Sequence, residues 1–132
     1  MTAKKILSLL LFALLLLGTL VGCTPSLDKL EEKFEEEGYA VRYNVNYNDI
    51  AKVYEEAGES FEKSAISRVL FVQDPDDSLR WLKIVEFYRR DDADLFFRLH
   101  EREYSRPQAG TTIKQKGKVI FYGTPSVYAV VD

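Results

Sequence analysis

The amino-acid sequence predicts a single small α+β domain in which helices pack on a largely antiparallel sheet. Three features of the chain predict this class. Apolar side chains recur at helical spacing in some segments and alternate with polar side chains in others, and turn residues separate the two kinds of segment. The predicted domain spans residues 23–132, which is long enough to bury a core without disulfide bonds. The single cysteine of the chain excludes an internal disulfide.

The first predicted helix follows almost directly after residue 23. Thr24 or Ser26 supplies its N-terminal cap, and Gly38 is the expected stop. Its apolar stripe at positions i, i+3 and i+7 consists of Leu27, Leu30 and Phe34. Five glutamates occupy the other side, which is typical of a solvated helix face.

Residues 39–47 alternate between apolar and polar side chains, the pattern of a half-buried strand. The apolar face consists of Tyr39, Val41, Tyr43, Val45 and Tyr47. A row of tyrosines is one way to build a carbohydrate-binding platform. The valines between them favour the alternative, a sheet face packed against a helix with the hydroxyls at its rim.

The middle of the chain adds a short helix over residues 48–57 and two strands, over residues 65–72 and 79–88. Turn-forming residues at 74–78 join the two strands. The second strand is apolar on both faces, with Trp81, Val85 and Phe87 on one and Leu82, Ile84 and Tyr88 on the other. Strands of this kind tend to lie at the centre of a sheet.

A longer helix is predicted over residues 91–105, with its apolar stripe formed by Ala93, Phe96, Phe97, His100 and Tyr104. A hairpin follows, whose strands over residues 111–115 and 118–122 flank a turn at Lys116 and Gly117. The chain then ends in a short helix or an edge strand through Val131.

Without the first helix, this order is compatible with the βαββαβ order of ferredoxin-like folds. Helices would then cover one face of the sheet. The first helix and the C-terminal segment would have to cover an edge or the open face. Such a fold would not indicate a function, because it carries many unrelated ones.

The N-terminal segment has the layout of a signal peptide. Lys4 and Lys5 precede a run that is apolar from Ile6 to Leu17 except for Ser8. A membrane-spanning helix needs about 20 apolar residues, and Gly18 interrupts the run before that length. The alternative is a short anchor helix that is never cleaved. We expect residues 1–22 to be removed.

The sequence Leu20-Val21-Gly22-Cys23 closely resembles the lipobox of bacterial lipoproteins. The resemblance covers the first 23 residues and leaves the family of the mature domain open. It implies cleavage between Gly22 and Cys23, with diacylglycerol and acyl lipid attached covalently to Cys23. The expected location is therefore the extracytoplasmic face of a bacterial membrane, held there by the lipid anchor.

Catalytic and metal-binding motifs are not apparent in the mature domain, and the sequence identifies no catalytic, metal or ligand-binding residue. The single histidine, His100, lies on the apolar stripe of a predicted helix, which favours a structural histidine over a catalytic base. The acidic segment at residues 74–79 lacks the glycine that a calcium loop needs at its sixth position, where Leu79 stands. A pair of catalytic carboxylates is not selected by any spacing.

The sequence therefore predicts a non-enzymatic binding module that needs no cofactor besides its lipid. Its partner class is a protein, an envelope polymer or a small ligand. The alternatives are an accessory subunit of a membrane complex and a small hydrolase. Without residues 1–22, 16 basic and 21 acidic side chains leave a net charge of −5, which argues against nucleic acid as a partner. A deep pocket that contains two carboxylates or His100 would favour the hydrolase.

Overall fold

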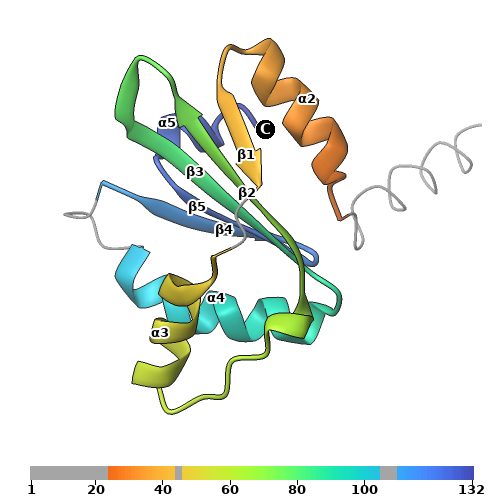
Figure 1. The fold of residues 1–132 in the computed structure, drawn as a ribbon, viewed down its shortest axis with the longest axis vertical. Coiled ribbons are helices and arrows are strands. Elements are labelled where there is room, and N and C mark those ends of the chain that lie inside the picture. Colours follow the sequence, from red (N-terminus) through yellow and green to blue (C-terminus); the bar gives the residue numbers. More distant parts are fainter. Residues whose placement is uncertain (1–23, 44–45, 105–109) are drawn as a thin grey trace, which may run out of the picture.

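A computed structural model describes residues 24–43, 46–104 and 110–132 of the chain, with the side chains of residues 102–104 left out (Figure 1). Its elements are, in order, α2 (Leu27–Glu36), β1 (Ala40–Tyr43), α3 (Asn48–Glu56), a 3-10 turn (Lys63–Ala65), β2 (Ile66–Asp74), β3 (Asp77–Phe87), α4 (Arg90–Tyr104), β4 (Thr112–Lys116), β5 (Val119–Gly123) and α5 (Pro125–Tyr128). The five strands form one sheet in the order β1-β2-β3-β5-β4, and all neighbours are antiparallel. The predicted α+β class is confirmed.

The sheet is covered on both faces. Helices α2 and α5 pack on one face and α3 and α4 on the other, so the domain has three layers (Figure 1). Of the two predicted places for the first helix and the C-terminal segment, an edge of the sheet or its open face, the structure shows the open face. The C-terminal segment is the short helix of the two predicted forms. The doubly apolar strand is β3, which lies at the centre of the sheet, also as predicted.

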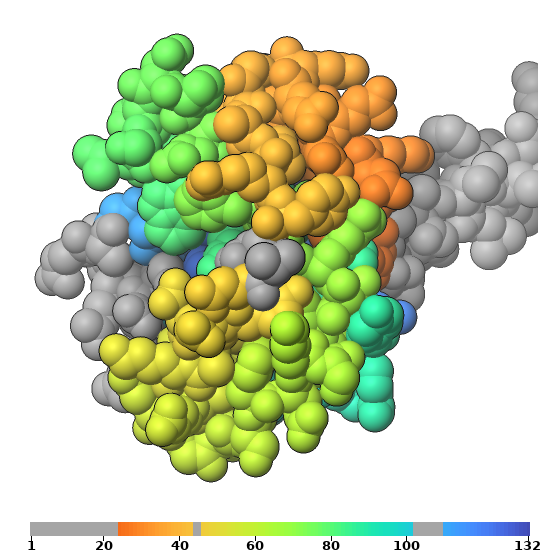
Figure 2. Space-filling view, in the orientation of Figure 1, coloured from red at the N-terminus to blue at the C-terminus, as the bar shows by residue number. Residues whose placement is uncertain are grey.

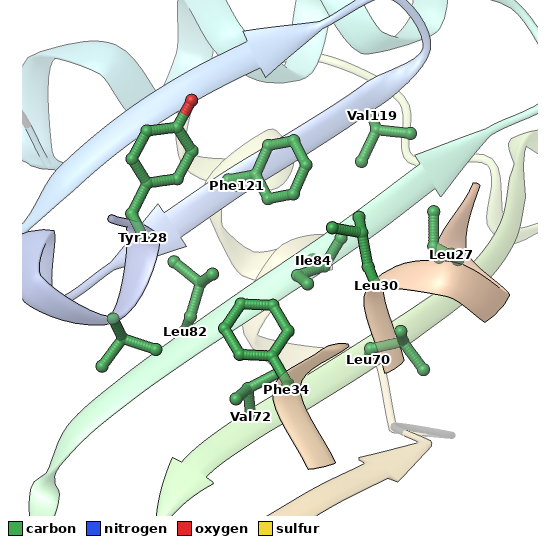
Figure 3. Packing of buried hydrophobic residues seen from close by; sticks show 11 residues of the cluster. Leu27, Leu30, Phe34, Leu70, Val72, Leu82, Ile84, Val119, Phe121 and Tyr128 are labelled. Carbon is green, nitrogen blue, oxygen red and sulfur yellow. The ribbon is translucent and has the colours of Figure 1, made fainter. Parts of the chain in front are cut away.

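The core under α2 is a closed apolar cluster. Leu27 and Phe34 of α2 are fully buried, and Leu30 is nearly so. They point toward the strands, where they pack on the cluster shown in Figure 3, including Leu70, Val72, Leu82, Ile84 and Phe121. A helix of ten residues is marginal alone in water, so this packing stabilises α2 more than its own propensity does.

The ferredoxin-like order is met only in part. Strands β3 and β4 are parallel with β5 between them, and α4 connects them, so this part is one split βαβ unit. Strands β1 and β2, by contrast, are antiparallel neighbours on either side of α3. The difference arises because β5 and β4 occupy the two positions on one side of β3. Strands β2 and β1 are then neighbours on the other side of β3.

The first strand is shorter than predicted, because α3 begins soon after it. Tyr39 and Val41 pack against the α2 core, which confirms the helix-packed face for these two residues. Tyr43 is 55% exposed, and its hydroxyl donates a hydrogen bond to Glu31. Tyr47 belongs to the opposite core, so the predicted single row of tyrosines does not form. Val45 lies outside the described residues.

We expect Phe34→Ala to destabilise the domain by about 3–5 kcal/mol, because it opens a cavity in the core under α2. Urea denaturation of the mature protein measures the change. Glu35→Ala, on the exposed side of the same helix, is the matched control and should change the unfolding free energy by less than about 0.5 kcal/mol. Equal, small effects of both substitutions would show that α2 is not part of the cooperative core.

Candidate ligand pocket between α3, α4 and the sheet

One row of side chains crosses the sheet on the face that α3 and α4 cover. Successive strand pairs place its members side by side in the order Arg42, Phe71, Lys83, Tyr122 and Ile113. Directly opposed side chains of antiparallel strands lie about 4.5–5.5 Å apart at their Cβ atoms. Lys83 is therefore at the centre of the sheet, with an aromatic ring on each side.

Aromatic rings form a continuous wall around this lysine. The Trp81 ring stacks on Phe71, with 6.1 Å between centroids and 18° between planes. It meets Tyr122 edge-on at 6.2 Å. The Tyr122 ring in turn lies 6.0 Å from the ring of His100 on α4. The wall therefore runs from β2 across the sheet to α4.

A cavity of about 210 Å³ lies between this wall and helix α3. From α3 it is lined by Ile50 and Val53, with Asp49 of the first turn contributing a carboxylate. The remaining lining residues are Phe71, Trp81, Lys83, His100 and Tyr122. An engineered apolar cavity of about 150 Å³ binds benzene, so this cavity has room for a ring and a small substituent. Figure 2 shows α3 and the segment after it covering the lower part of this side of the molecule.

Lys83 is unusual because it is 8% exposed and no described residue pairs with it. No ion pair or hydrogen bond joins its Nζ atom to a described residue, and its nearest ring contact is Tyr122 at 6.0 Å. Among the described residues, every fully buried side-chain nitrogen or oxygen has a hydrogen-bond partner. Because the Nζ atom of Lys83 has no such partner among these residues, it is not fully buried. The Nζ atom must therefore reach the open space of the cavity. Burial lowers the pKa of Lys83, and the charge of Asp49 offsets part of this effect.

His100 is 2% exposed, so it is buried, as its position on the apolar stripe of the helix predicts. Its Nδ1 atom lies 2.8 Å from the carbonyl oxygen of Phe96, and its ring stacks on the Phe96 ring at 3.8 Å. Burial lowers the pKa of His100 to about 4, opposed by the hydrogen bond to Phe96 and assisted by the charge of Lys83. The imidazole is therefore neutral at pH 7. The sequence did not indicate that it also lines a cavity.

Lys83 and His100 are the two buried polar side chains among the described residues apart from the tyrosines, and both line the same cavity. Perturbed titratable groups in a cleft are candidate site residues. The sequence did contain one signal for Lys83: a lysine in the middle of a strand that is apolar on both faces. A lysine at a strand position is usually at the surface, so this signal alone does not identify a site.

The lining also limits the chemistry. The described lining residues include one carboxylate and no serine, threonine or cysteine. They do not supply the hydroxyl or thiol of a serine or cysteine hydrolase, or a carboxylate pair. Within the described ranges, no group of three histidine, cysteine or acidic residues could hold a metal ion.

The predicted lipid site lies outside this description. Gly22 and Cys23 precede the first described residue, Thr24. In the described part of the chain, no helix has the length and apolar character to cross a bilayer.

We expect His100→Gln to destabilise the protein by about 0.5–3 kcal/mol at pH 7 and to leave ligand binding intact. Because folding lowers the pKa from 6.5 to about 4, the unfolded chain binds more protons in this range. The neutral imidazole contributes stability that is fully present above pH 6.5. About 3 kcal/mol of this stability is lost as the pH falls to about 4. Denaturant melts at several pH values should show a weaker pH dependence for the variant.

Arg98→Gln, an exposed change on the same helix to a residue that does not titrate, is the control and should keep the pH dependence of the wild type. A His100→Gln protein with full stability and lost function would instead make His100 a site residue. It would also place the small hydrolase ahead of the binding module.

Comparison with protein-family models, with curated proteins and with solved structures found no match. No relative therefore supplies a function for the pocket. Its interpretation rests on the geometry and chemistry of its own residues.

Proposed function

We propose that this chain is a lipid-anchored binding module on the extracytoplasmic face of a bacterial membrane, and that its cavity receives a small organic ligand. The observation that carries the proposal is the placement of the buried amine of Lys83 in an aromatic cavity, whose wall includes the neutral ring of His100. Ligand sites are typically concave and mostly apolar, with a few polar groups that fix the orientation of the ligand. Of the predicted partner classes, the cavity favours the small ligand.

The resemblance to the lipobox supports the anchor. Thr24, the residue after the predicted lipid site, lies beside the turn between β4 and β5, where its hydroxyl is 3.4 Å from the backbone nitrogen of Lys118. The carbonyl of Lys118 accepts a hydrogen bond from Phe87 at the end of β3. A tether at Cys23 would therefore attach the domain at this end of β3.

The position of the cavity is compatible with such a tether. Lys83 precedes Phe87 by four residues along β3, about 13 Å at the rise of an antiparallel strand. Trp81 lies two residues farther from the tethered end. A membrane at Cys23 would leave these lining residues away from the point of attachment, so a ligand could reach them from the aqueous side.

A small hydrolase is the second candidate, because His100 lines the cavity. Its lowered pKa makes the imidazole a weak base at pH 7, and the described lining residues include no serine, threonine or cysteine that it could activate. The binding module therefore fits the cavity better.

We expect Cys23→Ser to abolish lipid attachment, since the cysteine sulfur is the atom that would form the thioether. Metabolic labelling with palmitate in a bacterial host compares the wild type with the variant. The wild type should be labelled and cleaved, and the variant should accumulate as an unlabelled precursor. Ser26→Ala is the control and should be labelled like the wild type. Equal labelling of wild type and Cys23→Ser would end the lipoprotein hypothesis.

We expect Val53→Phe to weaken ligand binding at least tenfold, because the larger ring would fill part of the cavity. A set of neutral, cationic and anionic aromatic fragments is titrated against the mature protein. Binding is followed by the fluorescence of Trp81, the single tryptophan of the chain. Glu55→Phe places the same ring on an exposed position of α3 and should leave binding unchanged. A failure of every fragment to bind would contradict a small-ligand function.

A further inference from the structure

We propose that the ligand is a small monoanion, a carboxylate attached to a flat apolar body, and that Lys83 binds the carboxylate. This inference rests on the proposed function, since it identifies the class of ligand for the same cavity. Three features of the cavity support a carboxylate ligand: the buried amine, the size and shape of the space, and the acid on α3.

The first feature is the buried amine of Lys83, which needs a negatively charged partner. A charged group inside a protein is normally paired, because the loss of water around it is costly. Lys83 is 8% exposed, and none of the described residues forms an ion pair with it. Its neighbours in the cross-strand row are the aromatic residues Phe71 and Tyr122, neither of which carries a carboxylate. An ammonium group that faces a cavity and has no ion-pair partner among the described residues is suited to a counterion brought by the ligand.

The walls determine the shape of the rest of the ligand. Phe71 and Trp81 stack, and Tyr122 stands edge-on to Trp81, so the sheet side of the cavity is built from flat aromatic surfaces. Ile50 and Val53 close the opposite side with aliphatic side chains. A planar apolar group would bury its faces between these walls and keep its carboxylate near Lys83. A volume of about 210 Å³ limits the ligand to about one ring and a short acid side chain.

The acid on α3 favours a single negative charge. Asp49 lines the same cavity as Lys83, and the pKa of Lys83 responds to its charge. Asp49 forms no ion pair with Lys83, so the direct contact with the ammonium is open to one ligand carboxylate, and a second negative charge on the ligand would add to the repulsion from Asp49. No arginine is among the described residues that line the cavity, so the bidentate pairing that suits phosphate is absent there. The cavity should therefore prefer a carboxylate to a phosphate ester.

The test uses three probes of similar size: phenylacetate, the neutral phenylacetamide and phenyl phosphate. Each is titrated into the mature lipidated protein in detergent micelles at pH 7, with Trp81 fluorescence as the readout. We expect phenylacetate to bind at least tenfold more tightly than phenylacetamide. Phenyl phosphate should bind less tightly than phenylacetate in spite of its larger charge.

Two substitutions assign the preference to residues. Lys83→Met should reduce the affinity for phenylacetate to that for phenylacetamide and leave the affinity for the amide within about twofold. Asp49→Asn should strengthen binding of phenyl phosphate more than binding of phenylacetate. Lys52→Met makes the same change at an exposed position on α3 and should alter none of the affinities. Thermal melts check that each variant is folded, and Lys83→Arg, which keeps the charge, serves if Lys83→Met does not fold.

The outcomes separate the two proposals. If phenylacetamide binds as tightly as phenylacetate and Val53→Phe weakens both, the cavity is a ligand site but the inference of a carboxylate is wrong. Retention of the preference for phenylacetate in Lys83→Met, or its loss in Lys83→Arg, would also overturn the role of the Lys83 charge. If none of the probes or fragments binds, the proposed function fails, and the inference fails with it.

Discussion

Burial of the sheet on both faces is the constraint on which the rest of the structure depends. Strands β3 and β5 are flanked by other strands and covered by helices above and below, so their central residues have no side that faces solvent. Every residue of β5 is buried. A polar group in this central region cannot reach bulk water by turning over. It must be paired with another group, or it must face a cavity, and Lys83 does the second.

The two faces differ in how they are closed. Under α2 and α5 the buried cluster is entirely apolar apart from the hydroxyl of Tyr128. Under α3 and α4 the core shares its boundary with a cavity, and both Lys83 and His100 line that cavity. Burial, assisted by the charge of Lys83, lowers the pKa of His100 to about 4, which keeps the imidazole neutral at pH 7 and leaves Lys83 as the one cation among the described lining residues. The first face therefore provides stability, and the second has the chemical features of a binding site.

The sequence predicted the elements because their signals are local. The stripe of Leu27, Leu30 and Phe34, and the double apolar pattern of β3, depend on residues a few positions apart. The strand order and the cavity depend on pairing between distant segments. Phe71, Lys83 and Tyr122 become neighbours only when β2, β3 and β5 pair in register. No spacing in the sequence relates them, so the row and its central amine could not be predicted from the chain alone.

The charge of Lys83 also bears on what a ligand would gain. Burial already disfavours the charged form of Lys83, and water that enters the cavity would hydrate its ammonium. A neutral ligand that displaced this water would leave the charge unpaired, which opposes binding. A carboxylate would replace the water with a charge-assisted hydrogen bond, a stronger interaction than one between neutral groups. The same desolvation that makes Lys83 costly to the fold would therefore make the cavity selective for a ligand that carries a negative charge.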